Sequence, residues 1–308
     1  MFDLLFIGGS SVDIVLNVPR LPSRDEKLLV EYAGHYEGGM VANAACASAR
    51  LGMRTAWAGT LGDDENGRLM IDSFHDFGVD TSMAQVLQGV KTDFTVILLD
   101  PSGERTILVV PTTPVPITLD ANVYSELVDV SIVYTLPQPE NWFLPVAEAV
   151  HAGEGLIAVD VESSAPVNGA QLKNVIRLSD LVFCSRGGLA LLSSSDDPEY
   201  GAKLVLEMGP ELVCVTLGKL GAWVFTADEN HFSPGFSVPV TDTTGAGDSF
   251  HAAFLYGYLK KRPLDKVLQF ANAAASLSVQ ALGARGVFAT AGQVEAFLGT
   301  MTPVETGS

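Results

Sequence analysis

The sequence is poor in cysteine and lacks long apolar runs, and each shortage excludes a class of protein. Its three cysteines, Cys46, Cys184 and Cys214, lie in apolar segments and form no Cys-x-x-Cys pair. This pattern argues against a disulfide framework and against a zinc site. No stretch approaches the roughly 18 apolar residues that a membrane span requires. The N-terminus also lacks the basic region and cleavage pattern of a signal peptide, so we expect a cytoplasmic protein without a membrane partner.

Basic residues are scarce as well. The chain has 18 Lys and Arg against 36 Asp and Glu, which gives a formal net charge of −18. Nucleic acids and anionic membranes attract basic surfaces, so we expect neither as a partner. An anionic substrate would need a local positive pocket in such a protein.

Two familiar nucleotide-binding motifs are missing. Gly8-Gly9-Ser10-Ser11 follows the first apolar segment, but the Gly-x-Gly-x-x-Gly spacing of a dinucleotide-binding dehydrogenase is absent. Gly-x₄-Gly-Lys-Ser/Thr is absent too, which excludes a P-loop kinase. The chain of 308 residues at 47% hydrophobic content is long enough to bury a large core.

Strand-like and helix-like segments alternate through most of the chain. Such a rhythm predicts a mainly parallel sheet with helices on both faces. The expected strands are 4–8, 55–59, 131–135, 156–160, 180–184, 212–216 and 222–226, with a β-like stretch at 236–240. The expected helices are 44–51, 65–77, 140–152, 170–178, 188–193, 199–208, 246–260, 264–282 and 291–299.

Four further strand-like segments stand outside this alternation, at 14–18, 27–33, 94–99 and 105–110. Pro and Gly within 100–104 favour a tight hairpin between the last two. We expect the four to form a small sheet, inserted as a lid at about 12–35 and 93–110. With no linker or repeat in view, the prediction is a single domain over 1–308.

The most informative run is 242–250, Asp-Thr-Thr-Gly-Ala-Gly-Asp-Ser-Phe. Small residues at 245–247 allow a tight turn and a close backbone approach just before a helix. The N–H groups at a helix N-terminus lack internal partners and attract anions. Asp248 in the first turn could accept a proton from a hydroxyl during phosphoryl transfer. A carboxylate there could equally do no more than stabilise the helix.

This run closely resembles the C-terminal signature of the ribokinase-like (PfkB) carbohydrate kinases, and Gly38-Gly39-x-x-x-Asn43 resembles their N-terminal, sugar-binding signature. The resemblance covers essentially the whole chain. The pattern around Ser185 and the run 248–251 look most like the ketohexokinase and sulfofructose kinase branch. The resemblance implies a Rossmann-like three-layer α/β/α sandwich with a β-sheet lid, and transfer of the γ-phosphate of ATP to a sugar hydroxyl with Mg²⁺.

Carried over residue by residue, the resemblance assigns a role to each motif. Asp248 matches the catalytic base, and Gly245, Ala246 and Gly247 match the anion hole. The positions that match sugar contacts are Asp13, Gly39 and Asn43, although Asp13 alone would read as a solvated acid. The positions that match nucleotide contacts are Thr216, Gly218, Lys219, Gly221 and Asn272. A possible K⁺ loop would comprise Asp242, Thr244, Ala281, Ala284, Gly286 and Thr290.

One departure concerns the metal. Many members of the family carry Asn-x-x-Glu where this chain has Ser-Arg-Gly-Gly at 185–188. Asp160 and Glu162 could hold metal-bound waters instead, or be surface acids. Arg105 and Arg186 could meet an anionic group or remain solvated.

Three questions stay open at this stage. His251, one turn beyond Asp248, is expected to pack rather than to transfer protons. A nucleoside kinase of the same fold, or a non-catalytic sugar or nucleotide sensor, remains an alternative. The resemblance also implies a homodimer through the lid.

Overall fold

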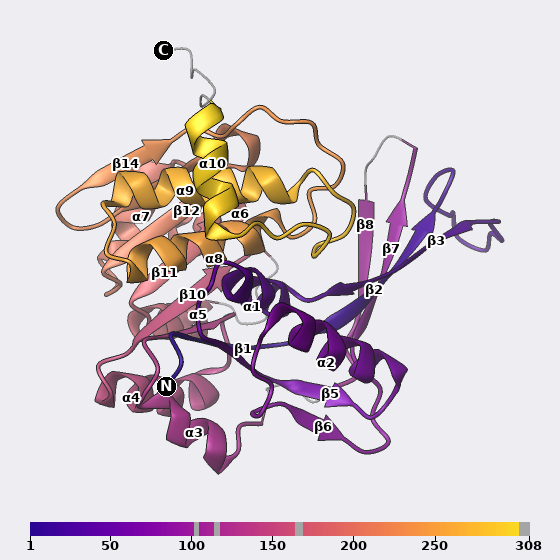
Figure 1. Cartoon of the computed structure of the whole chain (residues 1–308), viewed down its shortest axis with the longest axis horizontal. Coiled ribbons are helices and arrows are strands. Elements are labelled where there is room, and N and C mark those ends of the chain that lie inside the picture. Colours follow the sequence, from indigo (N-terminus) through magenta and orange to yellow (C-terminus); the bar gives the residue numbers. More distant parts are fainter. Residues whose placement is uncertain (102–104, 114–117, 164–168, 302–308) are drawn as a thin grey trace.

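The computed structural model describes residues 1–101, 105–113, 118–163 and 169–301, and a central eight-stranded sheet forms its middle layer (Figure 1). The strand order is β14-β13-β12-β11-β10-β9-β1-β4. Strands β12 through β4 are parallel, and β13 and β14 add an antiparallel edge. Their bounds are β1 Leu4–Ile7, β4 Thr55–Ala58, β9 Ile132–Thr135, β10 Leu156–Val161, β11 Leu181–Ser185, β12 Leu212–Thr216, β13 Ala222–Phe225 and β14 Asn230–Ser233.

Helices cover both faces of this sheet because alternate strand residues point to opposite sides. Leu4 and Phe6 of β1 join one apolar cluster, and Leu5 and Ile7 join the other. The first cluster contains α1 Met40–Arg50, α2 Glu65–Phe77, α8 Ala246–Leu259, α9 Leu264–Ser278 and α10 Ala291–Thr300. The second contains α3 Ala121–Leu127, α4 Glu140–Ala152, α5 Gly169–Arg177, α6 Arg186–Ser193 and α7 Pro198–Leu206. The predicted three-layer α/β/α sandwich with a mainly parallel sheet is therefore confirmed.

A separate four-stranded sheet stands beside this body, on the right of Figure 1. Its order is β3-β2-β7-β8, and the central pair β2 and β7 runs parallel. The strands are β2 Ser11–Asn17, β3 Glu31–Gly38, β7 Phe94–Leu99 and β8 Arg105–Val110. Part of the turn expected at 100–104 lies outside the described residues. We call this sheet the lid. A two-stranded sheet of β5 Thr60–Gly62 and β6 Gln85–Leu87 completes the fold.

The structure corrects several expected boundaries. The second lid strand begins at Glu31, so residues 27–30 precede it. The stretch 236–240 forms no strand, because Pro239 lacks the N–H that a ladder needs. The helix expected at 264–282 ends at Ser278, and the one expected from 44 begins at Met40.

The parallel topology decides where the chemistry-bearing residues meet. The carboxyl ends of β10, β11 and β12 lie at one edge of the sheet, and loops beyond such an edge commonly bind ligands. Asp160, Ser185 and Thr216 are at or next to those ends. None of the helices in the described part of the chain is long and apolar enough to cross a membrane.

Candidate active site

The N-terminus of α8 presents backbone N–H groups without acceptors. Gly245, its N-cap, has φ 78°, and a Cβ there would lie 2.7 Å from the carbonyl oxygen of Ala284, so only glycine fits. A Cβ on Gly247 would meet none of the described atoms within 4 Å. Nor does any described group accept a hydrogen bond from the N–H of Gly245, Gly247 or Asp248. The segment therefore offers free donors at the positive end of a helix dipole, an arrangement that suits an anion.

Asp248 lies in the first turn of α8 and is only 6% exposed. The Nδ2 group of Asn43 donates a hydrogen bond to its Oδ2 at 2.8 Å. Burial raises the pKa of the Asp248 carboxyl to about 8; the Asn43 bond opposes this rise, and the negative charges of Asp160 and Glu162 add to it. A carboxyl with such a pKa is suited to exchange protons near neutral pH.

Asn43 reaches Asp248 from α1. The N-cap of α1 is Gly39, whose φ of 93° favours glycine, and the N–H of Asn43 donates to the Gly39 carbonyl at 2.8 Å. Asn43 is therefore inside the helix rather than at its cap, and its side chain is free to point toward α8. The structure thus brings the two signature motifs, some 205 residues apart, into direct contact.

Asp13 of β2 faces a cavity of about 270 Å³ between the lid and the main body. The side chain is buried, so the residue is not the solvated acid that its sequence context suggests. Thr95 of β7 donates to its Oδ1 at 2.6 Å. Burial raises the pKa of Asp13, and the Thr95 bond opposes that rise. A Cβ on Gly38 would lie 2.4 Å from Asp13 Oδ2, so Gly38 leaves room for the carboxylate.

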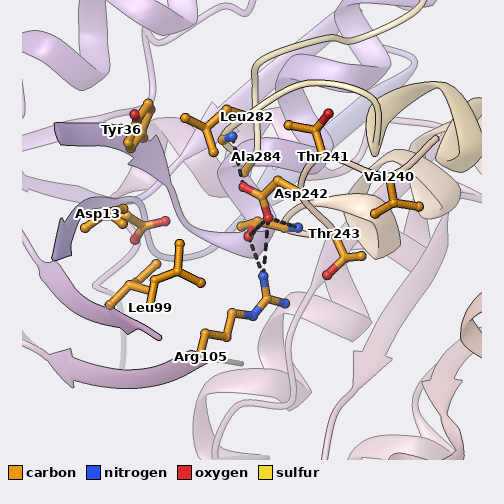
Figure 2. Close-up of a pocket in the computed structure, with 14 residues that line it drawn as sticks. Asp13, Tyr36, Leu99, Arg105, Val240, Thr241, Asp242, Thr243, Leu282 and Ala284 are labelled. Carbon is orange, nitrogen blue, oxygen red and sulfur yellow. Dashed lines mark hydrogen bonds and ion pairs between the residues drawn. The ribbon is translucent and has the colours of Figure 1, made fainter. Parts of the chain in front are cut away.

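Arg105 connects the lid to the loop before α8. Its guanidinium donates to the hydroxyl of Thr244 at 2.5 Å and lies 3.5 Å from Asp242 Oδ1. Figure 2 shows this side chain crossing the cavity of about 270 Å³ from the lid to Asp242, with Asp13 on the lid beside it. Arg105 is thus engaged within the protein and is not a freely solvated arginine. Arg186, in contrast, is exposed and lies 3.5 Å from the exposed Asp196, and it does not line this cavity.

A second cavity, of about 610 Å³, lies on the other side of the loop before α8. Its size is typical of a site for a drug-sized molecule. All five residues that match nucleotide contacts line it, together with Ala246, Gly247 and Thr243. Thr243 and Val240 line the smaller cavity too, so two residues border both spaces. The Nδ2 group of Asn272 donates to the carbonyls of Ser233 and Pro234, at 2.8 and 3.4 Å.

An acidic group surrounds the carboxyl end of β10. Asp160 is 2% exposed and therefore not a surface acid, and its Oδ1 has no hydrogen-bond partner among the described residues. Burial raises its pKa to about 7, although the hydroxyl of Tyr134 donates to Oδ2 at 3.3 Å. Glu162 accepts from the Ser185 hydroxyl at 3.1 Å, so the altered metal motif contacts this group. In the described part of the chain, no three His, Cys, Asp or Glu side chains are placed to hold a metal by themselves.

His251 packs as expected. It is buried against Phe183, with ring centroids 4.7 Å apart, and its Nδ1 lies 2.9 Å from the Tyr134 hydroxyl. Burial lowers its pKa to about 4, which leaves it neutral at physiological pH.

The residues of the possible K⁺ loop are partly brought together. Asp242 Oδ1 accepts from the N–H and hydroxyl of Thr244, and its Oδ2 accepts from the N–H of Gly283 at 3.0 Å. The carboxylate therefore joins the loop before α8 to the loop after α9. The Thr290 hydroxyl takes part in the capping box of α10.

Sequence reasoning missed Arg285. This arginine is 8% exposed and lies between two residues of the possible K⁺ loop. Its Nε donates to Asn43 Oδ1 at 2.9 Å, its Nη1 to the Ser73 hydroxyl at 2.8 Å and its Nη2 to the Gly38 carbonyl at 3.2 Å. An arginine inside an otherwise apolar, small-residue loop of an acidic protein was the one signal available.

Comparison with known proteins agrees with this geometry. The pattern of pfkB family carbohydrate kinases matches residues 1–290. The chain is 29% identical to the ribokinase of Bacillus subtilis over 97% of this chain and all of that protein. It is also 29% identical to the ATP-dependent ribose-1-phosphate kinase of Halopiger xanaduensis, over 97% and 98% of the two chains.

A solved structure shares the architecture. The ribokinase of Arabidopsis thaliana, complexed with ribose and ATP, superposes with a TM-score of 0.86 at 25% identity, over 96% of this chain and 98% of that one. These relatives are ribokinases and a ribose-1-phosphate kinase. The branch expected from the sequence, that of ketohexokinase and sulfofructose kinase, gains no support from them.

Proposed function

The chain belongs to the pfkB family of carbohydrate kinases and is an ATP-dependent carbohydrate kinase, and we propose that it phosphorylates a hydroxyl of a small sugar bound beside Asp13. The observation that carries this proposal is the shared border of the two cavities. Thr243 lines both of them, and the free N–H groups at the start of α8 follow directly. A sugar in the smaller cavity and a triphosphate in the larger one would meet at this helix N-terminus.

In this proposal Asp248 accepts the proton of the attacking hydroxyl. The free N–H groups of Gly245 and Gly247 stabilise the charge on the transferring phosphoryl group, which is most of what phosphoryl transfer requires from a protein. The N–H of Ala246 lies between them and donates to the Thr243 carbonyl at 3.3 Å in the structure. Asp13 accepts hydrogen bonds from sugar hydroxyls, and the NH₂ group of Asn43 donates to a sugar hydroxyl. Gly39 contacts the sugar through its backbone. The larger cavity holds ATP against Thr216, Gly218, Lys219, Gly221 and Asn272.

The residues around β10 fit a magnesium ion carried by the nucleotide. Asp160 Oδ1 has no hydrogen-bond partner among the described residues. Burial raises the pKa of Glu162, and the negative charge of Asp160 adds to that rise, so the two carboxyl groups interact. We propose that these two carboxylates hold waters of Mg²⁺ while the phosphates of ATP supply the remaining ligands. The ion would neutralise charge on the phosphates. K⁺ near Asp242 and Thr244 is a further proposal.

For the acceptor, we propose ribose first and ketoses second. Ribokinases are among the relatives, and one of them is complexed with ribose and ATP. The smaller cavity, at about 270 Å³, lies below the usual size for drug-sized ligands and so favours a free sugar over a nucleoside. The second place goes to ketoses because of the branch that the sequence resembles.

A coupled ADP-release screen tests the function. The purified full chain is assayed with Mg-ATP and pentoses, hexoses, ketoses, sugar acids, ribose 1-phosphate and nucleosides, with Asp248→Asn as the matched control. Sugar-dependent ADP release that the control lacks supports the proposal. Turnover confined to nucleosides would overturn the substrate class. ATP binding without turnover for any acceptor would instead favour a sensor.

We also propose a homodimer formed through the lid, and a cytoplasmic location. The lid carries exposed apolar side chains on both of its edge strands: Tyr32 on β3 and Ile107, Leu108 and Val109 on β8. Apolar groups gathered on one sheet favour association.

A further inference from the structure

Arg285 holds a buried position that packing alone does not explain. Its guanidinium lies over the ring of Phe74, 5.2 Å from the centroid, and among the described residues no carboxylate comes within ion-pair distance. Burying a charge without such a partner is costly, and an apolar side chain of similar volume would commonly give a more stable protein. Burial accordingly lowers the pKa of Arg285, and the negative charges of Glu37, Asp248 and Asp13 oppose that lowering. The position calls for a reason other than stability.

The hydrogen bonds suggest that reason. Arg285 has only donors, so the amide of Asn43 must present its oxygen to Arg285 Nε, at 2.9 Å. The NH₂ group of Asn43 is then forced to the other side, where it lies 2.8 Å from Asp248 Oδ2. Without Arg285, nothing else described bonds the amide oxygen of Asn43, and the amide could rotate to present either end.

Resting on the proposed function, we propose that Arg285 is a positioning residue that fixes the amide of Asn43 with its NH₂ group toward the carboxylate of Asp248. An NH₂ group can donate to a carboxylate but cannot accept from a carboxylic acid. This orientation therefore favours the ionised form of Asp248, which is the form that acts as a base. The bond from Arg285 to the Gly38 carbonyl, at 3.2 Å, holds the segment before Asn43 in the same arrangement.

Other charged groups around Asp248 also affect the protonation of its carboxyl group. Asp160 and Glu162 disfavour its ionised form, as burial does, and the Tyr134 hydroxyl lies near the same acids. Arg285 is the cation that opposes them. Removing Arg285 thus withdraws both a nearby positive charge and the lock on Asn43. Both losses move the pKa of Asp248 upward.

The test compares Arg285→Met, Arg285→Lys and the control Arg50→Met. Arg50 is an exposed arginine whose Nε lies 3.4 Å from the Phe288 carbonyl and which does not contact Asn43. We expect Arg285→Met to lower kcat/KM about tenfold and to shift the acidic limb of its pH profile upward by about one pH unit. Arg285→Lys should restore part of the charge effect without the fork of donors. Arg50→Met should match the wild type.

Two further measurements separate positioning from structure. In an Asn43→Ala background, Arg285→Met should lower kcat/KM clearly less than it does in the wild type, because the lock on Asn43 is already lost and only the charge effect on Asp248 remains. The carboxyl ¹³C signal of Asp248, assigned with Asp248→Asn, gives its titration without turnover, so the proposal can be judged even if no acceptor is found. An unchanged Asp248 titration in both Arg285 variants, or an undiminished effect in the Asn43→Ala background, would overturn it. Should Arg285→Met fail to fold, Arg285→Lys carries the same comparisons.

Discussion

Replacing Asp248 with Asn should lower the turnover of the enzyme and raise its stability against unfolding. Asn keeps the shape and an oxygen that can accept the 2.8 Å bond from Asn43, so we expect the fold to be retained. A positioned general base contributes about 10²–10⁴-fold to a rate, so turnover should fall at least about a hundredfold. Stability should rise, because the variant no longer buries an ionisable carboxyl.

The pH dependence of this gain follows from the pKa. Burial raises the Asp248 pKa from 3.8 to about 8, so the folded state binds a proton that the unfolded state has lost. The carboxyl is harmless below pH 4, destabilises progressively between pH 4 and pH 8, and reaches its full cost above pH 8. The shift sets an upper bound of about 6 kcal/mol on that cost. Asp248→Asn should therefore gain stability over the wild type across this window.

Urea unfolding at pH 5, 7 and 8.5, with ADP release on the same samples, measures both effects. Asp76→Asn, an exposed acid of α2, serves as the control for removing one negative charge. Near-wild-type turnover would refute the role of Asp248 as base. A gain in stability that does not grow with pH would refute the buried-carboxyl argument.

Three further predictions follow from the lid and the loops. Arg105→Met should lower kcat/KM about two- to tenfold, because it removes the contacts to Thr244 and Asp242, and Arg105→Lys should have an intermediate effect. An unchanged kcat/KM would show that these contacts do not contribute to the reaction. Turnover should be higher in K⁺ than in tetramethylammonium buffer, and equal rates would reject the K⁺ loop. Val109→Lys, on the 70% exposed Val109 of the lid edge, should convert a dimer to a monomer in sedimentation velocity, whereas a wild type that already sediments as a monomer would exclude the lid dimer.

Local patterns carried most of what could be predicted. The alternation of strand-like and helix-like segments was enough to predict the layered fold, because the hydrophobic period and the length of each segment depend only on residues close together in the sequence. The run at 242–250 indicated a helix N-terminus with an acid in its first turn, and the structure has both. The β-like stretch expected at 236–240 was wrong, because that expectation rested on the alternation of apolar residues and gave too little weight to Pro239, which cannot donate to a strand ladder. The late start of the second lid strand, at Glu31, lay beyond any local signal.

What could not be predicted depends on contacts between distant segments. Asp160 is similar in sequence context to a solvated acid at a strand end, and only the packing of Tyr134 and α8 makes it buried. Arg285 meets Asn43 across 242 residues of sequence. Its neighbours in sequence, Ala284 and Gly286, indicate a tight loop but not the direction of a long side chain. A motif search finds residues that act through their own local geometry. Residues that act by orienting another side chain become visible only when the fold places their donors.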